Sequence, residues 1–363
     1  LPHITSSTTY LSTYTFNDTM SKGMTYNKDA VIAVYDSKDA ADTTNVNNVD
    51  KSGAIAVWKS TDNDPNFAVT YGTSGDDSTM QVAMTKKGLN EINKKYSDKY
   101  IVVYYTANVN TDDSVTLGDK GNPNDVSLTW KRTSTDYYDI LKDECIVYSF
   151  GYDLTKKFSD DKGDATKVKF VIQNKSDNYY LVATGSNGVY QITGKSATEE
   201  GATQFSPSAA GKLVINGIEA DKYGFTETHS DAGYSLLKKE IIVNITSTKA
   251  AITPTQANIT GIQSKADTDS TANDGVVNGT ALKNDVTVQT TAASATVDET
   301  KATMTKHGES NNAYVNMEVT NQKQFLLPMT GGAGSYALII AGVVIAGCGF
   351  MIVKKNQKRK EIQ

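Results

Sequence analysis

Cysteine, proline and histidine are scarce in this sequence. Only two of its 363 residues are cysteines, Cys145 and Cys348, and the second lies in an apolar stretch, which excludes a framework of disulfide bonds. The three histidines, His3, His229 and His307, are not spaced as metal ligands. Six prolines and 27 glycines are too few for collagen or for a wholly disordered chain. We expect no metal and no cofactor, so something else must stabilise the fold.

Acidic residues outnumber basic ones except at the C-terminus. The formal net charge is −5, but residues 354–363 hold five basic residues against one acidic residue. Without them, 31 basic and 40 acidic residues give residues 1–353 a net charge of −9. This acidic body gives no reason to expect nucleic acid as a partner. The adjacent His229, Ser230 and Asp231 would point apart on a strand, so they do not indicate a hydrolase.

Aromatic and β-branched residues are abundant. Twenty tyrosines, with many threonines and valines, favour β-sheet over helix. The length is typical of two domains. The chain starts at Leu1 with neither an initiator methionine nor a signal-peptide pattern, so we expect it to be the C-terminal part of a longer, exported protein. We predict an all-β secreted protein that is not an enzyme.

Three features follow one another in the last forty residues. Residues 327–331 read Leu-Pro-Met-Thr-Gly, no charged residue occurs from Gly331 to Val353, and the basic tail comes next. The apolar stretch is long enough to cross a bilayer as a helix, with the tail in the cytoplasm. In this order the three features resemble the cell-wall sorting signal of Gram-positive surface proteins.

That resemblance implies covalent attachment by a sortase. A sortase cysteine would attack the Thr330 carbonyl, release Gly331–Gln363, and pass the Thr330 acyl group to an amine of peptidoglycan or of a neighbouring subunit. The apolar span would hold the precursor in the membrane only until sorting. The motif consists of Leu327, Pro328, Met329, Thr330 and Gly331.

Residues 1–142 are predicted to form the first domain. Residues 8–16, 30–35 and 100–106 are β-branched and aromatic runs typical of strands. Thr85–Ser97 has apolar residues near helical spacing and predicts one helix. Gly121-Asn-Pro-Asn124 predicts a turn before the strand Val126–Trp130.

Parts of this first domain resemble the fimbrial isopeptide-forming domain of sortase-assembled pilins, a CnaA-like sandwich. The matching segments are Tyr14–Tyr26, Val102–Asn110 and Gly121–Trp130. The resemblance implies that Asp18 is an assisting acid and Asn124 the acceptor amide, with Asn122 as the alternative. The partner lysine of that family lies upstream of these segments, so it is not in this chain.

Residues 143–326 are predicted to form the second domain. Period-two alternation gives three strands an apolar face that carries one reactive polar residue each. Buried lysine and carboxylate groups are unfavourable unless they are paired or neutralised, which suggests that the three polar residues meet. The three faces are Phe150, Tyr152, Leu154 and Lys156; Tyr223, Phe225 and Glu227; and Met317, Val319 and Asn321.

This second domain resembles a CnaB-type domain of pilins. It shares the first strand Asp153–Lys156, the Tyr-x-Phe-x-Glu-Thr segment from Tyr223 to Tyr234 that in pilins is called the E box, and a final Asn321 before the sorting signal. Residues 246–311 depart from the family. They lack aromatic residues and are either an insertion without fixed structure or an extra set of hairpins, for which Val286–Val288 and Ala295–Val297 allow strands. We therefore predict two Ig-like β-sandwiches, CnaA-like then CnaB-like, and a C-terminal transmembrane helix in the sorting signal, residues 327–363.

Lys156, Glu227 and Asn321 would permit an intramolecular isopeptide bond. Burial lowers the pKa of a lysine, and its neutral amine could attack the Asn321 carboxamide while Glu227 polarises the carbonyl oxygen and shuttles the proton. We predict a subunit of a sortase-polymerised pilus, in particular a backbone subunit. The alternatives are a monomeric cell-wall-anchored adhesin with an unidentified host ligand and an anchored enzyme whose catalytic domain lies upstream.

Overall fold

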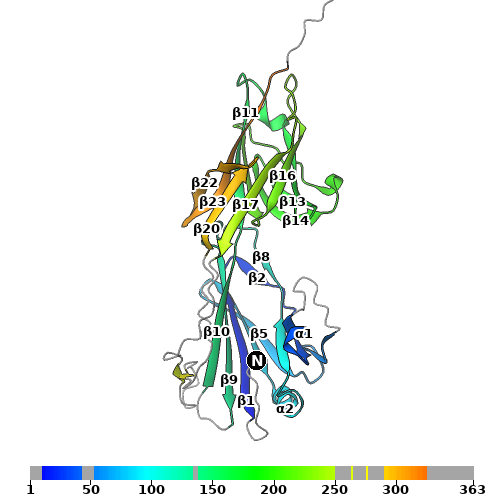
Figure 1. Cartoon of the computed structure of the whole chain (residues 1–363), viewed down its shortest axis with the longest axis vertical. Helices are drawn as coiled ribbons and strands as arrows, with labels where there is room; N and C mark the ends of the chain where they lie inside the picture. Colours follow the sequence, from blue (N-terminus) through cyan, green and yellow to red (C-terminus); the bar gives the residue numbers. More distant parts are fainter. Residues whose placement is uncertain are drawn as a thin grey trace, which may run out of the picture.

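The computed structural model describes residues 10–42, 53–133, 138–249, 263–264, 275–276 and 290–324. These residues are mainly β-strands, so the all-β prediction is confirmed. Two stacked units lie along the long axis of the molecule (Figure 1). The sorting motif and the predicted membrane span lie outside the described residues.

The first unit packs a five-stranded antiparallel sheet against a smaller sheet. The large sheet has the order β10-β9-β1-β6-β5, and the smaller one has the order β4-β3-β7 beside a β2–β8 pair. Buried side chains such as Ile32, Phe67 and Trp130 fill the space between the layers. The strands are β1 (Leu11–Met20), β2 (Met24–Tyr26), β3 (Val31–Tyr35), β4 (Ala56–Lys59), β5 (Phe67–Ser74), β6 (Asp77–Met84), β7 (Tyr100–Tyr104), β8 (Ala107–Val109), β9 (Asn122–Arg132) and β10 (Tyr138–Val147).

The predicted helix is present as α2 (Lys86–Lys95), and a single turn, α1 (Lys38–Asp42), follows β3. Thr85 caps the N-terminus of α2, because its hydroxyl accepts a hydrogen bond of 3.2 Å from the Gly88 N–H. Ile92 is buried, and the Asn93 side chain bonds both backbone groups of Leu11, at 2.8 and 3.0 Å. The helix is thereby fixed to the start of β1.

The second unit is a single eleven-stranded mixed sheet folded around one core. Its order is β21-β20-β17-β16-β12-β13-β14-β15-β11-β23-β22. Tyr152, Phe170 and Phe225 are fully buried in this core. The strands are β11 (Phe150–Phe158), β12 (Lys169–Asn174), β13 (Tyr179–Ser186), β14 (Val189–Ser196), β15 (Lys212–Ile218), β16 (Lys222–His229), β17 (Ile241–Lys249), β20 (Thr290–Val297), β21 (Thr300–Ala302), β22 (Met304–His307) and β23 (Ser310–Asn321).

The first and last strands of the second unit are parallel neighbours. In the register of β11 and β23, Lys156 lies opposite Val319, and Phe158 lies opposite Asn321. Side chains two residues apart on a strand share a face. The register therefore puts Lys156 and Asn321 next to each other on the core side, although 165 positions separate them in the sequence.

Two predictions about the region between the units are wrong. Strand β10 pairs with β9 as far as Val147 opposite Asn122, so the first sheet extends beyond the predicted boundary at residue 142. Residues 122–124 are not a turn but the start of β9. The bend occurs one residue earlier, at Gly121, whose φ of +61° suits glycine. An Asn-Pro-Asn sequence signals a turn locally, but pairing with β1 and β10 on both sides overrides that preference.

Part of the 246–311 segment is an extra set of hairpins, one of the two predicted alternatives. Strand β17 pairs with β20, β20 with β21, and β22 with β23. The strand predicted at Ala295–Val297 is the end of β20, where Ala293 and Ala295 are buried. Short strands β18 (Gln263–Ser264) and β19 (Gly275–Val276) pair with each other, and Val286–Val288 lies outside the described residues.

The two units touch through a loop between β8 and β9, residues 110–121, which we call the junction loop. Val115 and Leu117 are buried against Ala313 of β23. Asp119 accepts a hydrogen bond of 2.9 Å from the Asn311 N–H, and the Ser310 hydroxyl accepts one of 3.3 Å from the Lys120 N–H. This loop fixes the first unit to the turn between β22 and β23.

Candidate functional sites

The structure brings Lys156, Glu227 and Asn321 together in the core of the second unit. Lys156 and Asn321 come from the adjacent strands β11 and β23, and Glu227 reaches them from β16 on another side of the core. All three residues are buried. The Lys156 Nζ lies 3.8 Å from Glu227 Oε1, and the same oxygen accepts a hydrogen bond of 2.8 Å from Asn321 Nδ2.

The Lys156 amine sits in a largely apolar place. It lies 4.8 Å from the centre of the Phe158 ring and donates to the carbonyl oxygens of Lys157 and Val319, at 3.0 and 3.3 Å. Burial lowers the pKa of Lys156 from 10.5 to about 8, although the nearby Glu227 acts in the opposite direction. The neutral, nucleophilic form of this amine is therefore more accessible near neutral pH than that of an exposed lysine.

The carboxylate of Glu227 is fixed at both oxygens. Its Oε2 accepts a hydrogen bond of 2.8 Å from the Leu237 N–H, which leaves Oε1 facing the amine and the amide. One oxygen atom is thus within reach of both groups that a Lys–Asn condensation would change. The sequence suggested that Glu227 would contact the carbonyl oxygen of Asn321; in the structure it contacts the nitrogen.

The Asn321 amide has a further partner that sequence reasoning missed. Its Nδ2 also donates to the Ser230 hydroxyl at 2.6 Å, while its Oδ1 is buried and has no hydrogen-bond partner in the described part of the chain. Ser230 was considered only with its neighbours as a hydrolase triad. That triad is not formed: His229 Nδ1 contacts the Thr228 hydroxyl, and Asp231 accepts from the Asp164 and Ala232 N–H groups.

The chain that leaves the site is fastened immediately after Asn321. Lys323 pairs with Asp160 at 2.7 Å, and Asp160 also accepts from the Tyr234 hydroxyl at 2.5 Å. The Tyr234 ring packs on Phe158 at 4.5 Å between ring centres. These contacts cover the site from the side where the chain continues toward the sorting motif.

A similar arrangement surrounds Asp18 in the first unit. The Asp18 carboxylate accepts hydrogen bonds from the Tyr26 hydroxyl at 2.5 Å, the Tyr105 hydroxyl at 2.8 Å and Asn124 Nδ2 at 3.2 Å. Burial raises the pKa of Asp18, partly offset by these hydrogen bonds. The Asn124 Oδ1 is buried without a partner among the described residues, as is that of Asn321.

The geometry separates the two candidate amides of the first unit. Asn122 has partners for both ends of its amide: Oδ1 accepts from the Thr116 N–H at 2.9 Å, and Nδ2 donates to the Thr116 and Val147 carbonyls at 3.0 and 3.2 Å. Asn124, in contrast, contacts the acid. Asn122 therefore holds the junction loop to β10, and Asn124 is the asparagine of the two that contacts Asp18. In the part of the chain that the structure describes, the side-chain partners of Asp18 are Tyr26, Tyr105 and Asn124, and none of them is a lysine.

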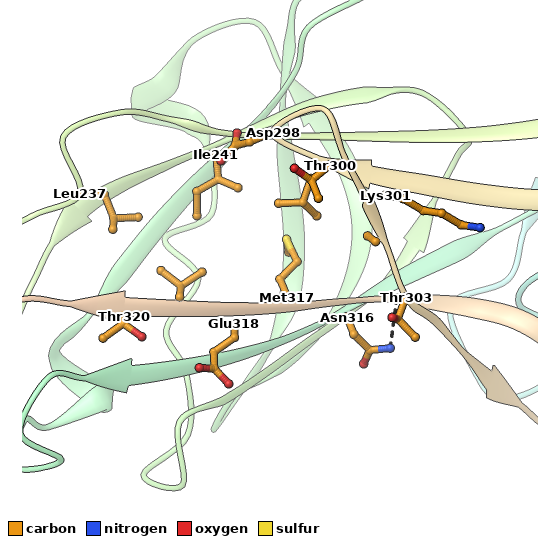
Figure 2. A pocket seen from close by; sticks show the side chains of 13 residues that line it. Leu237, Ile241, Asp298, Thr300, Lys301, Thr303, Asn316, Met317, Glu318 and Thr320 are labelled. Atoms are coloured by element: carbon orange, nitrogen blue, oxygen red, sulfur yellow. Dashed lines mark hydrogen bonds between the residues drawn. The ribbon is translucent and has the colours of Figure 1, made fainter.

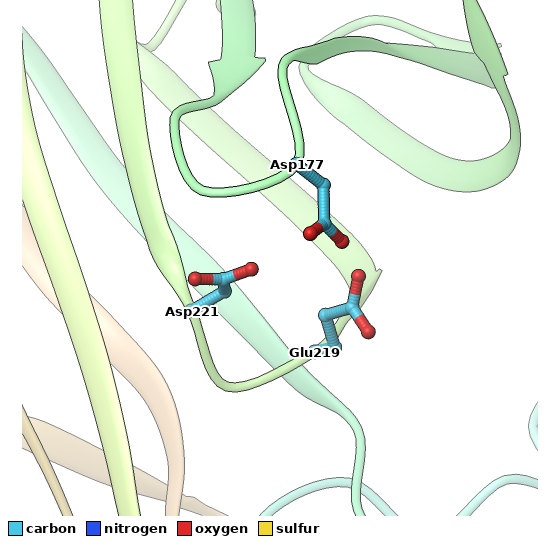
Figure 3. Close-up of side chains that lie close together, drawn as sticks. All are labelled: Asp177, Glu219 and Asp221. Atoms are coloured by element: carbon cyan, nitrogen blue, oxygen red, sulfur yellow. The ribbon is translucent and has the colours of Figure 1, made fainter. Parts of the chain in front are cut away.

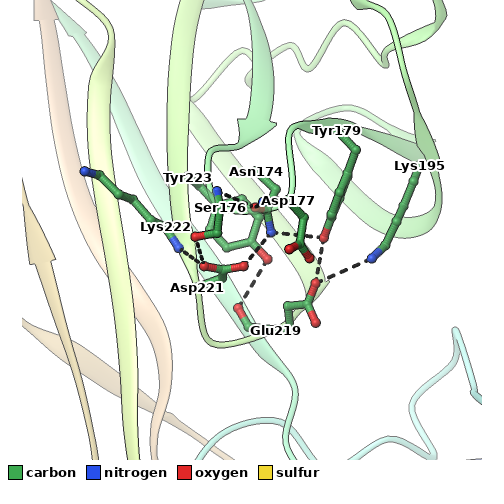
Figure 4. Close-up of polar contacts among 9 residues, drawn as sticks. All are labelled: Asn174, Ser176, Asp177, Tyr179, Lys195, Glu219, Asp221, Lys222 and Tyr223. Carbon is green, nitrogen blue, oxygen red and sulfur yellow. Dashed lines mark hydrogen bonds and ion pairs between the residues drawn. The ribbon is translucent and has the colours of Figure 1, made fainter. Parts of the chain in front are cut away.

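An acidic cluster of Asp177, Glu219 and Asp221 lies where the β12–β13 and β15–β16 turns of the second unit meet (Figure 3). Hydrogen bonds within the surrounding turns account for it (Figure 4). Asn174 donates to Asp221 at 2.9 Å, and Tyr179 donates to Glu219 at 2.6 Å, with Lys195 3.6 Å away. The hydrogen bonds of this cluster thus hold the β12–β13 turn against the β15–β16 turn.

A groove of about 440 Å³ runs between the β20–β21 hairpin and the second half of β23 (Figure 2). Its lining includes the apolar side chains of Leu237, Met317 and Val319 and the charged side chains of Asp298, Lys301 and Glu318. Asn316 is bonded across it to the Thr303 carbonyl at 3.3 Å. Through Leu237 and Val319 the groove adjoins the surroundings of Glu227 and Lys156.

Two protein families match this sequence. Residues 152–260 match SpaA, a prealbumin-like fold domain, and residues 319–361 match the LPXTG cell wall anchor motif. The protein is a cell-wall-anchored surface protein of a Gram-positive bacterium. The anchored protein has a prealbumin-like fold in the unit that carries Lys156 and Glu227, and the predicted resemblance to sortase-assembled pilins is confirmed. Among the described residues, no helix is long and apolar enough to span a membrane.

Several solved pilin structures are similar to this chain in fold. The pilus 2b backbone protein of group B streptococcus is 16% identical over 88% of both chains, with a TM-score of 0.42. Domains D2 and D3 of the major pilin SpaD from Corynebacterium diphtheriae are 14% identical over 89% of this chain and 90% of that one, with a TM-score of 0.48. The T6 backbone pilin of Streptococcus pyogenes is 14% identical over 87% and 62%, with a TM-score of 0.43. No curated protein matches the sequence.

Proposed function

We propose that this wall-anchored protein is a structural subunit of a sortase-polymerised pilus, in particular a backbone subunit, and that an isopeptide bond between Lys156 and Asn321 closes its CnaB-type second domain. The observation that carries this proposal is the position of Glu227 Oε1, which lies beside both the amine and the amide in a buried site. A stability role alone would not require a lysine there, because a buried charge is unfavourable unless it is neutralised or well paired.

The reaction begins with a proton transfer. Lys156 Nζ gives a proton to Glu227 Oε1, which leaves a neutral amine and a neutral carboxylic acid. The lowered pKa of Lys156, about 8, makes this transfer easier than it would be for an exposed lysine. The amine then attacks the carboxamide carbon of Asn321, and its electron pair forms the new C–N bond while the carbonyl π electrons move to Oδ1.

The second step expels ammonia. Glu227 returns its proton to Nδ2, with which it is already in hydrogen-bond contact, and takes the surplus proton from the former lysine nitrogen. The C–Nδ2 bond breaks, the carbonyl reforms, and one ammonia leaves for each isopeptide bond formed. The fold holds the reactants together, so a weak nucleophile and a poor electrophile can react once. Because the protein acts a single time on itself, we propose that it is not an enzyme.

The place of the bond in the fold suggests a mechanical role. Lys156 lies near the end of the first strand of the domain, and Asn321 ends the last strand, nine residues before Thr330. Tension that enters through Thr330 would pass from residue 321 across the bond to β11, and the residues between 156 and 321 would not be stretched. A subunit joined to its neighbours through Thr330 would in this way remain folded under load.

Intact-mass measurement of residues 1–330 tests the bond. We expect a mass that is lower than the sequence mass by one ammonia, and no such deficit in the Glu227→Ala variant. A wild-type chain with the full sequence mass would refute the bond.

Polymerisation is tested separately by electrophoresis of cell-wall extracts boiled in detergent. We expect a ladder of covalent multimers that requires the sortase and Thr330. Monomer-sized bands alone, with an active sortase, would refute the pilus subunit and favour a monomeric adhesin.

A further inference from the structure

Both candidate acceptor asparagines are held by a carboxylate and a hydroxyl. Asn321 Nδ2 donates to Glu227 at 2.8 Å and to Ser230 at 2.6 Å. Asn124 Nδ2 donates to Asp18 at 3.2 Å and to the Tyr105 hydroxyl at 3.1 Å. Both amides have a buried Oδ1 without a hydrogen-bond partner in the described ranges.

This shared arrangement does not come from a shared motif. Ser230 follows β16 by one residue and is a serine, whereas Tyr105 follows β7 by one residue and is a tyrosine. The two sheets also differ in strand order. Two unlike units that place a hydroxyl on the same atom of a corresponding asparagine suggest that the hydroxyl has a chemical task.

The two partners of the Asn321 amide have different tasks. A carboxamide nitrogen carries two hydrogens, and in Asn321 one goes to Glu227 and the other to Ser230. A carboxylate only accepts hydrogen bonds, so Glu227 selects the orientation with Nδ2 toward it. A hydroxyl can donate or accept, so Ser230 does not select the orientation but gives the nitrogen a second fixed contact in it.

We propose that Ser230 is a further residue of the cross-linking site. Its hydroxyl holds Asn321 Nδ2, the nitrogen that leaves as ammonia, in contact with Glu227. The inference rests on the proposed Lys156–Asn321 bond. When Glu227 protonates Nδ2, the departing nitrogen gains a third hydrogen, and the Ser230 oxygen accepts one of the three. No atom of Ser230 is gained or lost in the reaction.

A time course of cross-linking in the full chain tests this role. The chain is synthesised in a short cell-free pulse, samples are quenched in acid at intervals, and intact mass gives the fraction that has lost ammonia. Because a single hydrogen bond is removed, we expect Ser230→Ala to slow the loss by about three- to tenfold. Ser230→Thr, which keeps the hydroxyl, should restore most of the rate.

A stability measurement separates this role from a general defect in folding. In the Glu227→Gln background, where no bond forms, Ser230→Ala should leave the chain folded and lower the midpoint of chemical unfolding only by the small amount expected for one lost hydrogen bond. The pH dependence of the cross-linking rate should keep its midpoint, since Ser230 does not titrate, while the maximum rate falls.

The possible results are distinguishable. If ammonia is lost at the same rate in Ser230→Ala, or if Ser230→Thr is as slow as Ser230→Ala, the role of Ser230 is refuted and the bond itself stands. If the wild-type chain loses no ammonia, the bond is refuted, and the role of Ser230 with it.

Discussion

Each unit surrounds an asparagine amide with a carboxylate and a hydroxyl, but the two units differ in the side chains that lie beside the carboxylate. In the second unit, Glu227 has the Lys156 amine 3.8 Å from the oxygen that contacts Asn321. In the first unit, Asp18 is held by the hydroxyls of Tyr26 and Tyr105. In both units, therefore, the fold brings a buried acid into contact with an asparagine amide, while a lysine amine lies beside the acid in the described part of the second unit.

In each unit, burial shifts the pKa of one titratable side chain. Asp18 lies in a core of aromatic rings, with Tyr26 and Tyr105 5.8 Å apart between ring centres, and desolvation raises its pKa. The amine of Lys156 lies against Phe158 in the second unit, and burial lowers its pKa. Each unit thus shifts a titratable group toward its neutral form, which is the form that the proposed chemistry uses.

The largest expected difference between the units concerns the covalent bond. Glu227→Gln keeps the size of the side chain but cannot shuttle the proton, so we expect the mass deficit to vanish. Closing a loop of this length stabilises a domain by about 5 kcal/mol, and this amount should be lost from the free energy of unfolding of the second unit in urea.

Asp18→Asn is the matched control in the first unit. Because no lysine is among the side-chain partners of Asp18 in the described residues, this variant of residues 1–330 should have the same mass deficit as the wild type. A change in the deficit would mean that a lysine within the chain reacts there, which would contradict the difference between the units.

The next effect is a pH dependence that should appear once the bond is prevented. In Asn321→Ala the Lys156 amine stays free, with a pKa of about 8 when folded and 10.5 when unfolded. Between these values the unfolded chain binds one more proton, so stability should rise with pH across this window, by up to about 3 kcal/mol. Urea unfolding at pH 7 to 11 measures it.

The double variant Lys156→Met with Asn321→Ala isolates that effect. It retains every other lysine and tyrosine, so subtracting its pH profile leaves the contribution of Lys156. If the difference in the free energy of unfolding between the two variants does not change with pH, or falls as pH rises, burial does not lower the pKa of the Lys156 amine.

A smaller effect separates the two asparagines of the first unit. Asn122→Ala removes three hydrogen bonds to part-buried backbone groups of Thr116 and Val147, so we expect a loss of about 2 kcal/mol. Asn124→Ala also removes an amide oxygen that has no partner, and should lower stability less. Thermal unfolding of both variants measures this, and the reverse order would contradict the assignment.

The smallest expected effect tests the contact between the units. Asp119→Ala removes the acceptor for the Asn311 N–H, and we expect a loss of about 1 kcal/mol. Hydrogen exchange at Asn311 should become faster. Asp113→Ala, which changes an exposed carboxylate of the same junction loop, is the control and should leave that exchange rate unchanged.

Much of this could be predicted from local patterns. Alternation along β11, β16 and β23 identified Lys156, Glu227 and Asn321 as core-facing, because a strand places every second side chain on one face. The helix predicted within Thr85–Ser97 followed from spacing as well. Ser230 could not be found in this way, since it lies beyond the end of β16, where alternation no longer tells the direction of a side chain.

The sequence by itself determined the β-rich composition, the anchor at residues 327–331 and the identity of the three polar residues on apolar faces. Each of these depends on residues close together in the chain. The tertiary structure decided which of Asn122 and Asn124 faces Asp18, that β10 continues past residue 142, and that Glu227 contacts the nitrogen of Asn321. These depend on strand register and on contacts across the core, which are settled only when segments far apart in the sequence pack together.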